Sequence, residues 1–233
     1  KAHKVKVSLR HPSMVPSNVY LDPKLSLSMP SRVSASTGMD ALTQLLEAYI
    51  TKKRNPFTDG LCLQGLEMVS QSLTKVMEAP NDLAKRQNML IAAYFSGVAL
   101  ANSGLGAVHG FAGPMGGMFD VPHGEVCASL LPSVMEFNIK VIDSTDGDIK
   151  EDIKQRLTRI AALFLPSGET NFNLLPDFFY KLKEELQIRN IADMGVQKKD
   201  WPTLIEKSMN SSSMKGNPVI LGPDQLESIL LAS

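Results

Sequence analysis

Residues 104–128 read GLGAVHGFAGPMGGMFDVPHGEVCA, and this glycine-rich stretch decides how the rest of the chain is organised. It contains two of the four histidines, His109 and His123, with glycines beside both. A histidine that only filled a core would not need such permissive backbone on either side. Glycine allows sharp turns and lets a ligand approach the backbone closely. The stretch therefore predicts the floor of a site, and its two imidazoles indicate a metal site.

A carboxylate that could complete this site lies on an upstream predicted helix. Residues 40–50, DALTQLLEAYI, space their apolar side chains for one helical face, and Thr37 is the predicted N-cap. Asp40 and Gln44 are one turn apart and so share a face. One carboxylate with two imidazoles suits Zn²⁺ or Fe²⁺ and leaves positions for water or substrate oxygen. Two other interpretations stay open: a solvated helix edge for Asp40 and Gln44, and separate structural roles for the histidines.

Helical periodicity continues through most of the chain, so the expected fold class is mainly α with a short extended β lead-in. Strands are expected over 4–9 and 18–21, within an extended lead-in that covers 1–30. A polar loop is expected over 141–150. The other expected helices cover 58–77, 83–101, a short segment near His109, 123–137, 151–164, 175–187, a segment starting at Pro202 and one starting at Pro223.

The composition limits the classes of function. The 24 basic residues balance 24 acidic residues, so neither a nucleic-acid partner nor a membrane partner is expected. No apolar run approaches the roughly 20 residues of a membrane span, and no signal peptide is visible. Cys62 and Cys127 lie in apolar helical patterns and are too few for a disulfide framework. Buried free thiols and a cytoplasmic location are therefore expected. His3 and His11, among basic residues, are expected at the surface.

Three motifs, in order, resemble the iron-containing, or group III, alcohol dehydrogenases, and the resemblance covers nearly the whole chain. The first motif includes residues 21–23 (LDP), 29–30 (MP), 37–43 (TGMDALT) and 47–49 (EAY); the second includes 108–110 (VHG), Pro114 and 122–124 (PHG); the third, weaker one is 216–218 (GNP). The resemblance implies the helical, dehydroquinate synthase-like metal domain of that family. Residues 1–30 would be the end of an N-terminal dinucleotide-binding domain, and residues 31–233 the helical metal-binding domain.

The resemblance also implies an activity: NAD(P)-dependent interconversion of an alcohol and an aldehyde or ketone, with Fe²⁺ or Zn²⁺ polarising the substrate oxygen. Asp40, His109 and His123 match three family metal ligands, and His123 is also the expected catalytic residue. Lys6 matches a lysine that contacts the cofactor in relatives, and Leu25 is assigned to cofactor binding with it. The implied partners are a small-molecule substrate and a second copy in a homodimer. Because the phosphate-binding glycines belong to the preceding domain, residues 1–233 alone are expected to be inactive.

Two positions depart from the family pattern inside the site. A fourth family ligand, a histidine, is replaced by Gln44, and a further family histidine is replaced by Gly113. Gln44 could coordinate weakly through its amide oxygen or leave three ligands, and the lost imidazole is expected to favour harder ions. Gly113 is expected to enlarge the pocket for a bulkier substrate. A metal-free relative, a non-catalytic helical domain, and a glycerol dehydrogenase-like or dehydroquinate synthase-like enzyme stay open as alternatives.

Overall fold

The computed structural model describes residues 11–144 and 147–233, and the regular structure within these ranges is helical, without strands. The mainly α fold expected from the sequence is therefore confirmed. The described residues form nine α-helices: α1 Ser31–Ile50, α2 Pro56–Glu78, α3 Leu83–Ser103, α4 Ala107–Met118, α5 His123–Ser144, α6 Asp148–Phe164, α7 Leu175–Glu185, α8 Trp201–Met209 and α9 Pro223–Ala232.

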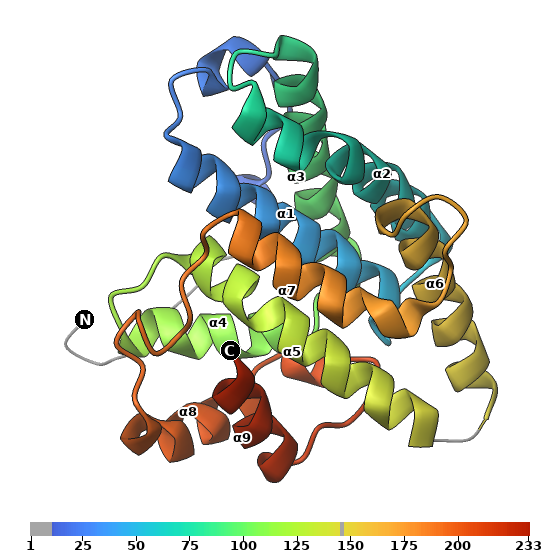
Figure 1. The fold of residues 1–233 in the computed structure, drawn as a ribbon, viewed down its shortest axis with the longest axis vertical. Helices are drawn as coiled ribbons and strands as arrows, with labels where there is room; N and C mark the ends of the chain where they lie inside the picture. Colours follow the sequence, from blue (N-terminus) through green and yellow to red (C-terminus); the bar gives the residue numbers. More distant parts are fainter. Residues whose placement is uncertain (1–10, 145–146) are drawn as a thin grey trace.

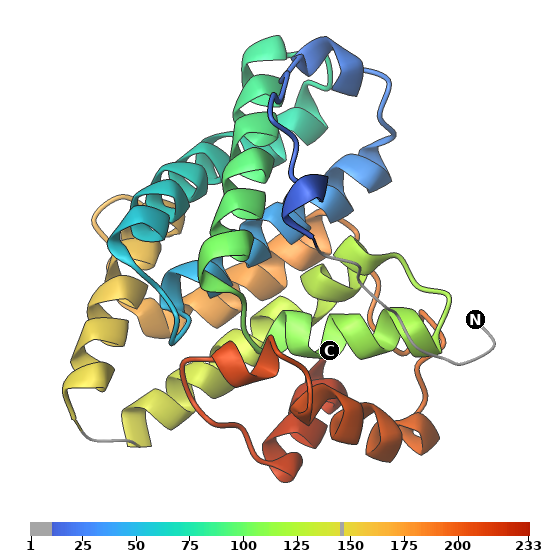
Figure 2. The same ribbon diagram turned by 180° about the vertical axis from the view of Figure 1, so that it is seen from behind.

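Helix α1 runs through the middle of the molecule (Figure 1) and packs against α2, α3 and α5. Because it has neighbours on several sides, nearly all of its side chains from Gly38 onward are buried. Figures 1 and 2 place α2 and α3 at one end of the molecule and α4, α8 and α9 at the other. Helix α5 packs against α1, α4, α7 and α9, so it joins the two ends. The core is continuous along this α1–α5 axis.

The first helix begins at Ser31, so the prediction that Thr37 is an N-cap was wrong. Pro30 takes the N-cap position with φ −58° and ψ 146°, a conformation that proline adopts readily. Thr37 lies inside α1, where its Oγ1 donates a hydrogen bond to the Val33 carbonyl at 2.8 Å. A threonine hydroxyl can be satisfied in this way within a helix, so its presence did not require a helix start.

The lead-in differs from the expectation in a similar way. Residues 18–21 form no strand, and the short 3-10 helices η1 (Pro12–Met14) and η2 (Pro23–Ser26) lie on either side of them. Residue types that favour a strand are not sufficient, because a strand also needs a hydrogen-bonding partner. Tyr20 is 91% exposed, so this segment lies on the surface. The expected strand over 4–9, together with His3, lies outside the described residues.

The polar segment 141–150 is mostly helical rather than a loop. Helix α5 continues to Ser144, beyond its expected end near Phe137, and α6 already begins at Asp148. Ile142 is 1% exposed and extends the buried face of α5 by another turn, which outweighs the polar character of its neighbours. Gly147, with φ 117°, makes the turn into α6 in a region that other residues rarely adopt.

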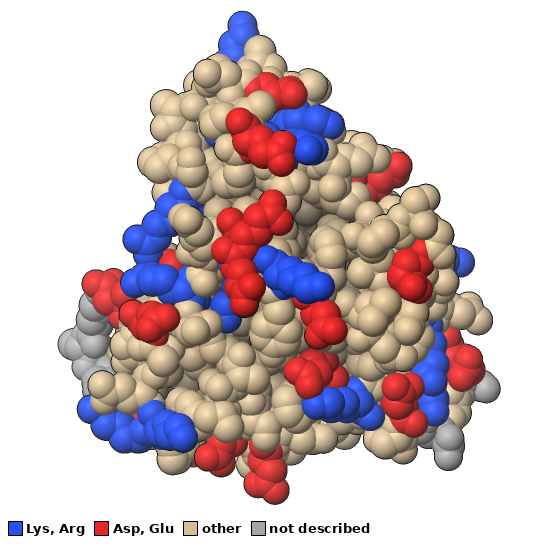
Figure 3. All heavy atoms as spheres, viewed as in Figure 1, with Lys and Arg blue, Asp and Glu red and all other residues tan. Residues whose placement is uncertain are grey.

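Charge on the surface is mixed. Figure 3 shows basic and acidic side chains interspersed over one face of the molecule, in keeping with a formal net charge of zero. Within the described residues, no single helix is long and apolar enough to cross a membrane. Helices α3 and α4 reach the necessary length and apolar composition only when taken together, and a 97° bend separates them.

Candidate metal centre

Four side chains from three helices converge where α1, α4 and α5 meet. They are Asp40 of α1, His109 of α4, and His123 and Cys127 of α5, and one ligand atom from each lies within 4.8 Å of the others. His109 Nε2 is 3.2 Å from Asp40 Oδ1, and His123 Nε2 is 4.0 Å from the same oxygen. The structure thus brings together Asp40, His109 and His123, three residues far apart in the sequence.

The close approach of α5 to α1 depends on Gly124. A Cβ at this position would lie 2.9 Å from the carbonyl carbon of Ser36 in α1, still closer to its oxygen, and 3.4 Å from the Asp40 Cβ. No side chain fits there without separating the helices. The glycine next to His123 therefore serves a helix–helix contact, and this contact sets the imidazole beside the Asp40 carboxylate.

Helix α4 is held at its first turn by two side chains from distant elements. Glu47 Oε1 accepts a hydrogen bond from the Val108 N–H at 2.7 Å, and Asn217 Oδ1 accepts one from the Ala107 N–H at 3.1 Å. A helix start leaves such N–H groups without intrahelical partners, so these two oxygens cap α4. Asn217 is itself anchored, since its Nδ2 donates to Asn138 Oδ1 at 2.7 Å. The third sequence motif thus contributes to the position of His109.

The orientation of His109 is fixed by Glu47. The Nδ1–H group donates to Glu47 Oε2 over 2.7 Å, and both side chains are buried. This hydrogen bond assigns the proton to Nδ1 and turns Nε2 toward the other three side chains, the arrangement found around metal-binding histidines. Burial on its own lowers the pKa of His109, but its contacts with Cys127, Asp40 and Glu47 outweigh burial and raise the pKa well above its usual range.

Asp40 stays ionised although it is largely buried. Burial raises the pKa of its carboxyl group, but the hydrogen bond to His109 and the nearby charges of His109 and His123 outweigh that effect. The pKa of Asp40 is consequently lowered, so the carboxylate is available as an acceptor or ligand at neutral pH.

Cys127 is the site residue that the sequence analysis missed. Its side chain is 0% exposed, and its sulfur lies 3.7 Å from His109 Nε2 and 3.8 Å from His123 Nε2. Burial raises the pKa of the thiol to about 12, so without a cation the group is neutral. Cys62 and Cys127 are both buried and free, as expected. The spacing of His123 and Cys127, four residues apart in one helix, was the signal that could have identified the pair.

The four donors fit a tetrahedral divalent cation. Bond lengths of about 2.0–2.1 Å to nitrogen or oxygen and about 2.3 Å to sulfur place neighbouring tetrahedral donors roughly 3.3–3.6 Å apart. The His109–Asp40 distance of 3.2 Å and the sulfur–nitrogen distances of 3.7 and 3.8 Å lie close to these values, and the His123–Asp40 distance of 4.0 Å is longer by about 0.7 Å. Small side-chain movements would suffice to bring all four donors into bonding range. The residues present therefore suit Zn²⁺ or Fe²⁺ chemically.

The cluster has a buried side and an open side. Cys127 is fully buried and the His109 side chain is 7% exposed, whereas Asp40 is 20% and His123 34% exposed. Solvent or a small molecule therefore reaches the cluster past His123 and Asp40, as a catalytic site requires.

The other candidate residues lie elsewhere. The amide oxygen of Gln44 accepts a hydrogen bond from Ser96 Oγ of α3 at 2.9 Å, so coordination by Gln44 would require that bond to be shared or broken. A Cβ at Gly113 would meet no atom within 4 Å, so there is free space beside α4. Leu25 is 82% exposed in η2, and Lys6 lies outside the described residues.

The first turn of α5, which carries His123, is clamped by two arginines. Glu125 is almost fully buried; Arg189 donates to both of its oxygens, at 2.8 and 2.9 Å, and Arg32 donates to one at 2.9 Å. The hydrogen bonds from Arg189 are the main reason that the pKa of Glu125 falls to about 2, with Arg32 adding to them against the effect of burial. The carboxylate thus ties α5 to α1 and to the segment after α7.

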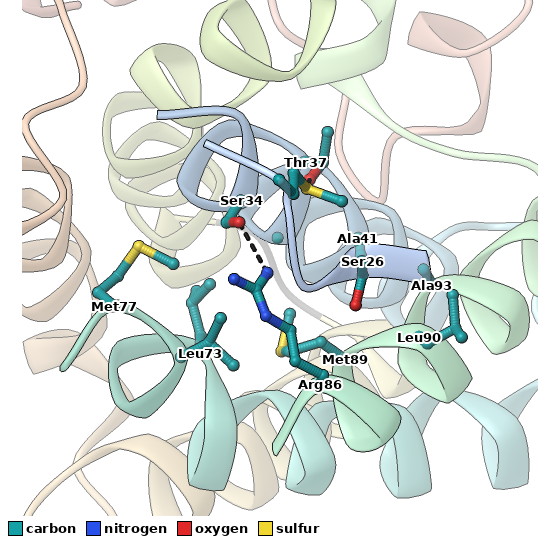
Figure 4. Close-up of a pocket in the computed structure, with 13 residues that line it drawn as sticks. Ser26, Ser34, Thr37, Ala41, Leu73, Met77, Arg86, Met89, Leu90 and Ala93 are labelled. Carbon is teal, nitrogen blue, oxygen red and sulfur yellow. Dashed lines mark hydrogen bonds between the residues drawn. The ribbon is translucent and has the colours of Figure 1, made fainter. Parts of the chain in front are cut away.

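A cavity lies on a neighbouring face of α1 (Figure 4). Its volume is about 110 Å³, and Met29 of the lead-in, Leu73 and Leu90 are among its mostly apolar lining residues. Arg86, the charged residue at its wall, donates to Ser34 Oγ at 2.8 Å and to the Pro80 carbonyl at 2.9 Å. Small-molecule and cofactor pockets are usually about 300–1,000 Å³, so this cavity is too small to enclose a nucleotide.

Comparison with known proteins adds to this geometry. A family profile described as the Fe-containing alcohol dehydrogenase family, C-terminal, matches residues 34–233. The chain is 32% identical over 205 residues to a 1,3-propanediol dehydrogenase of Klebsiella pneumoniae, covering 88% of this chain and 51% of that protein. It is 32% identical over 228 residues to alcohol dehydrogenase 4 of Saccharomyces cerevisiae, covering 97% and 57%.

Solved structures give the same result for the fold. The iron-containing alcohol dehydrogenase of Thermococcus thioreducens superposes with a TM-score of 0.79 at 27% sequence identity, covering 95% of this chain and 55% of that one. The chain thus spans about half the length of the relatives it matches.

Proposed function

Because the chain belongs to the Fe-containing alcohol dehydrogenase family, as its C-terminal helical domain, we propose that it supplies the metal-binding half of an enzyme that interconverts an alcohol and an aldehyde or ketone with NAD(P)H. The observation that carries this proposal is the cluster of Asp40, His109 and His123 at the junction of α1, α4 and α5. Two imidazoles and an ionised carboxylate, open to solvent on one side, form a donor set suited to Zn²⁺ or Fe²⁺.

Asp40, His109 and His123 would hold the cation, with Gln44 or Cys127 as candidates for a further donor. When bound, a divalent metal acts as a Lewis acid on the substrate oxygen, and NAD(P)H is the hydride donor or acceptor. Contacts within the chain hold the proposed metal ligands in position. Glu47 keeps the His109 proton on Nδ1, and the Gly124 contact keeps His123 beside Asp40.

His123 is proposed as the catalytic residue because it borders the open side of the cluster. Its side chain is 34% exposed, whereas His109 is buried behind it. A substrate oxygen that approaches the centre would therefore pass His123 and Asp40. The open space next to Gly113, on the adjacent helix α4, supports a substrate bulkier than the simplest alcohols.

The nucleotide would be held mainly by a second domain. The proposed boundary is the one expected from the sequence: residues 1–30 as the end of a dinucleotide-binding domain and residues 31–233 as the metal-binding domain. Val15, Tyr20 and Leu25 of this lead-in are 70%, 91% and 82% exposed, which supports a surface that another domain covers. Leu25 and Lys6 are the proposed cofactor contacts. The proposal includes a homodimer and a cytoplasmic location.

The test is metal analysis of the intact natural protein, combined with NADH- and NADPH-dependent reduction of a panel of aldehydes and ketones. We expect stoichiometric Zn or Fe and cofactor oxidation, both lost in Asp40→Asn and His123→Ala. His11→Ala is the matched control, because His11 is an exposed lead-in histidine whose Nδ1 lies 2.7 Å from Ser13 Oγ. A protein that binds no metal under any loading condition and oxidises neither cofactor would rule out this function and leave a non-catalytic helical domain.

A further inference from the structure

The thiol of Cys127 occupies a position that an ordinary core cysteine does not need. Its sulfur is 3.7 Å from one imidazole nitrogen and 3.8 Å from the other, and it shares the cluster with the Asp40 carboxylate. We propose that Cys127 is the fourth protein ligand of the centre, bound as a thiolate, and that it shifts the metal preference of the centre toward Zn²⁺. This inference rests on the proposed metal-binding function.

The distances agree with a shared cation. Two donors on one tetrahedral zinc, one sulfur and one nitrogen, lie about 3.6 Å apart. The two observed sulfur–nitrogen distances exceed this value by only 0.1–0.2 Å, without any repacking. The sulfur is thus nearly equidistant from the two imidazole nitrogens, as expected for ligands of one cation.

Rigid elements hold the sulfur in place. His123 and Cys127 are one turn apart at the start of α5, so their relative position is set by helix geometry. Cys127 is fully buried, whereas His123 is 34% exposed. With four protein ligands in place, a substrate oxygen would bind as a fifth ligand from the open side at His123.

Gln44, the other candidate for a fourth donor, is turned toward α3. Its amide oxygen already accepts the Ser96 hydroxyl at 2.9 Å, and an amide is a weaker donor than a thiolate. The Cys127 sulfur, by contrast, lies within hydrogen-bonding distance of both imidazole nitrogens. Coordination by Cys127 therefore exchanges contacts within the cluster for bonds to the cation, whereas coordination by Gln44 would require its bond to Ser96 to be shared or broken.

The charges also balance. The Asp40 carboxylate and a Cys127 thiolate together carry two negative charges, which match a divalent cation in a largely buried place. The thiol proton of Cys127 and the Nε2 proton of His109 are released to solvent when the cation binds, as for other cysteine and histidine ligands. A thiolate is a soft ligand that favours zinc, so the expectation that the lost imidazole favours harder ions is reversed in this proposal.

The test is cobalt substitution in the intact natural protein after removal of its metal. One Co²⁺ per chain should bind with a thiolate-to-cobalt charge-transfer band in the near ultraviolet. This band should disappear in Cys127→Ser and persist in Cys62→Ser, a matched control because Cys62 is the other fully buried thiol. X-ray absorption of the zinc-loaded wild-type protein should show one sulfur at about 2.3 Å.

The outcomes separate this inference from the proposed function. One cobalt bound without the charge-transfer band, or a zinc shell of only nitrogen and oxygen, overturns the role of Cys127 and leaves the metal centre intact. A protein that binds no metal overturns both. If Cys127→Ser fails to fold or binds no cobalt, the zinc absorption spectrum of the wild-type protein decides, since it needs no variant.

Discussion

Substitution of Gly124 by alanine tests whether the contact between α5 and α1 builds the metal centre. The added Cβ would lie 2.9 Å from the Ser36 carbonyl carbon and closer still to its oxygen, whereas ordinary contacts begin near 3.4 Å. The obstacle is the backbone of α1, which cannot rotate away as a flexible side chain can. The first turn of α5 must therefore move away from α1 by roughly 0.5–1 Å, and His123 moves with it.

The size of the effect follows from this displacement. Overpacking of this kind destabilises a protein by about 1–3 kcal/mol. Metal sites tolerate deviations of only about 0.2 Å in ligand distance. His123 Nε2 is already 4.0 Å from Asp40 Oδ1, so a further separation enlarges the side-chain movement that His123 needs to reach a shared cation. We expect the zinc affinity to fall by at least about 10-fold, the lower end of what loss of a supporting contact costs.

Gly113→Ala is the matched control, from the same glycine-rich stretch. A Cβ there meets no atom within 4 Å, and the residue lies inside α4. Replacing a helical glycine by alanine stabilises by roughly 0.5–1 kcal/mol. Gly113→Ala should therefore unfold at higher urea concentration, with unchanged zinc affinity.

Both variants are measured as intact metal-free protein, by urea unfolding and by zinc titration against a competing chelator. The reasoning about packing is refuted if Gly124→Ala is as stable as the wild-type protein. If Gly124→Ala loses stability but retains the wild-type zinc affinity, the packing argument survives and the link between this contact and His123 does not.

Three further predictions concern the groups around the centre. Glu47→Gln leaves His109 without its charged partner at Nδ1, so zinc affinity should fall by about 10–100-fold in a chelator competition, whereas an unchanged affinity would contradict the orienting role of Glu47. The pKa of Glu125 is lowered from 4.5 to about 2, mainly by the hydrogen bonds from Arg189 and next by Arg32. The ionised carboxylate therefore adds about 2–3 kcal/mol to the free energy of unfolding above pH 4.5, and this contribution is lost as the pH falls toward 2. The stability difference between metal-free wild-type protein and Glu125→Gln should thus shrink over this range in urea melts, and a constant difference would count against the clamp. Asn217→Ala removes an acceptor from the start of α4 and a partner from Asn138, and should lower the free energy of unfolding by roughly 1–3 kcal/mol, with the exposed Asn210→Ala as a control near zero.

Much of the fold could be predicted from the sequence because the apolar periodicity of a helix is a local feature of the chain. The apolar spacing of residues 40–50 and the proline at position 202 correspond to α1 and to the first turn of α8. The boundaries were less predictable. Thr37 has the chemistry of an N-cap but lies inside α1, and residues 18–21 were predicted as a short strand but form none.

The sequence by itself determined the helical class, the family, and three of the four side chains that meet in the centre: Asp40, His109 and His123. Their residue types and neighbouring motifs are local, and local features can be read along a chain. Only the tertiary structure decided that Cys127 lies beside these three side chains and that Gln44 accepts a hydrogen bond from Ser96. It also decided that the backbone of α1 packs directly against Gly124. These facts depend on how α1, α4 and α5 cross, and a crossing is set by the packing of all three helices together.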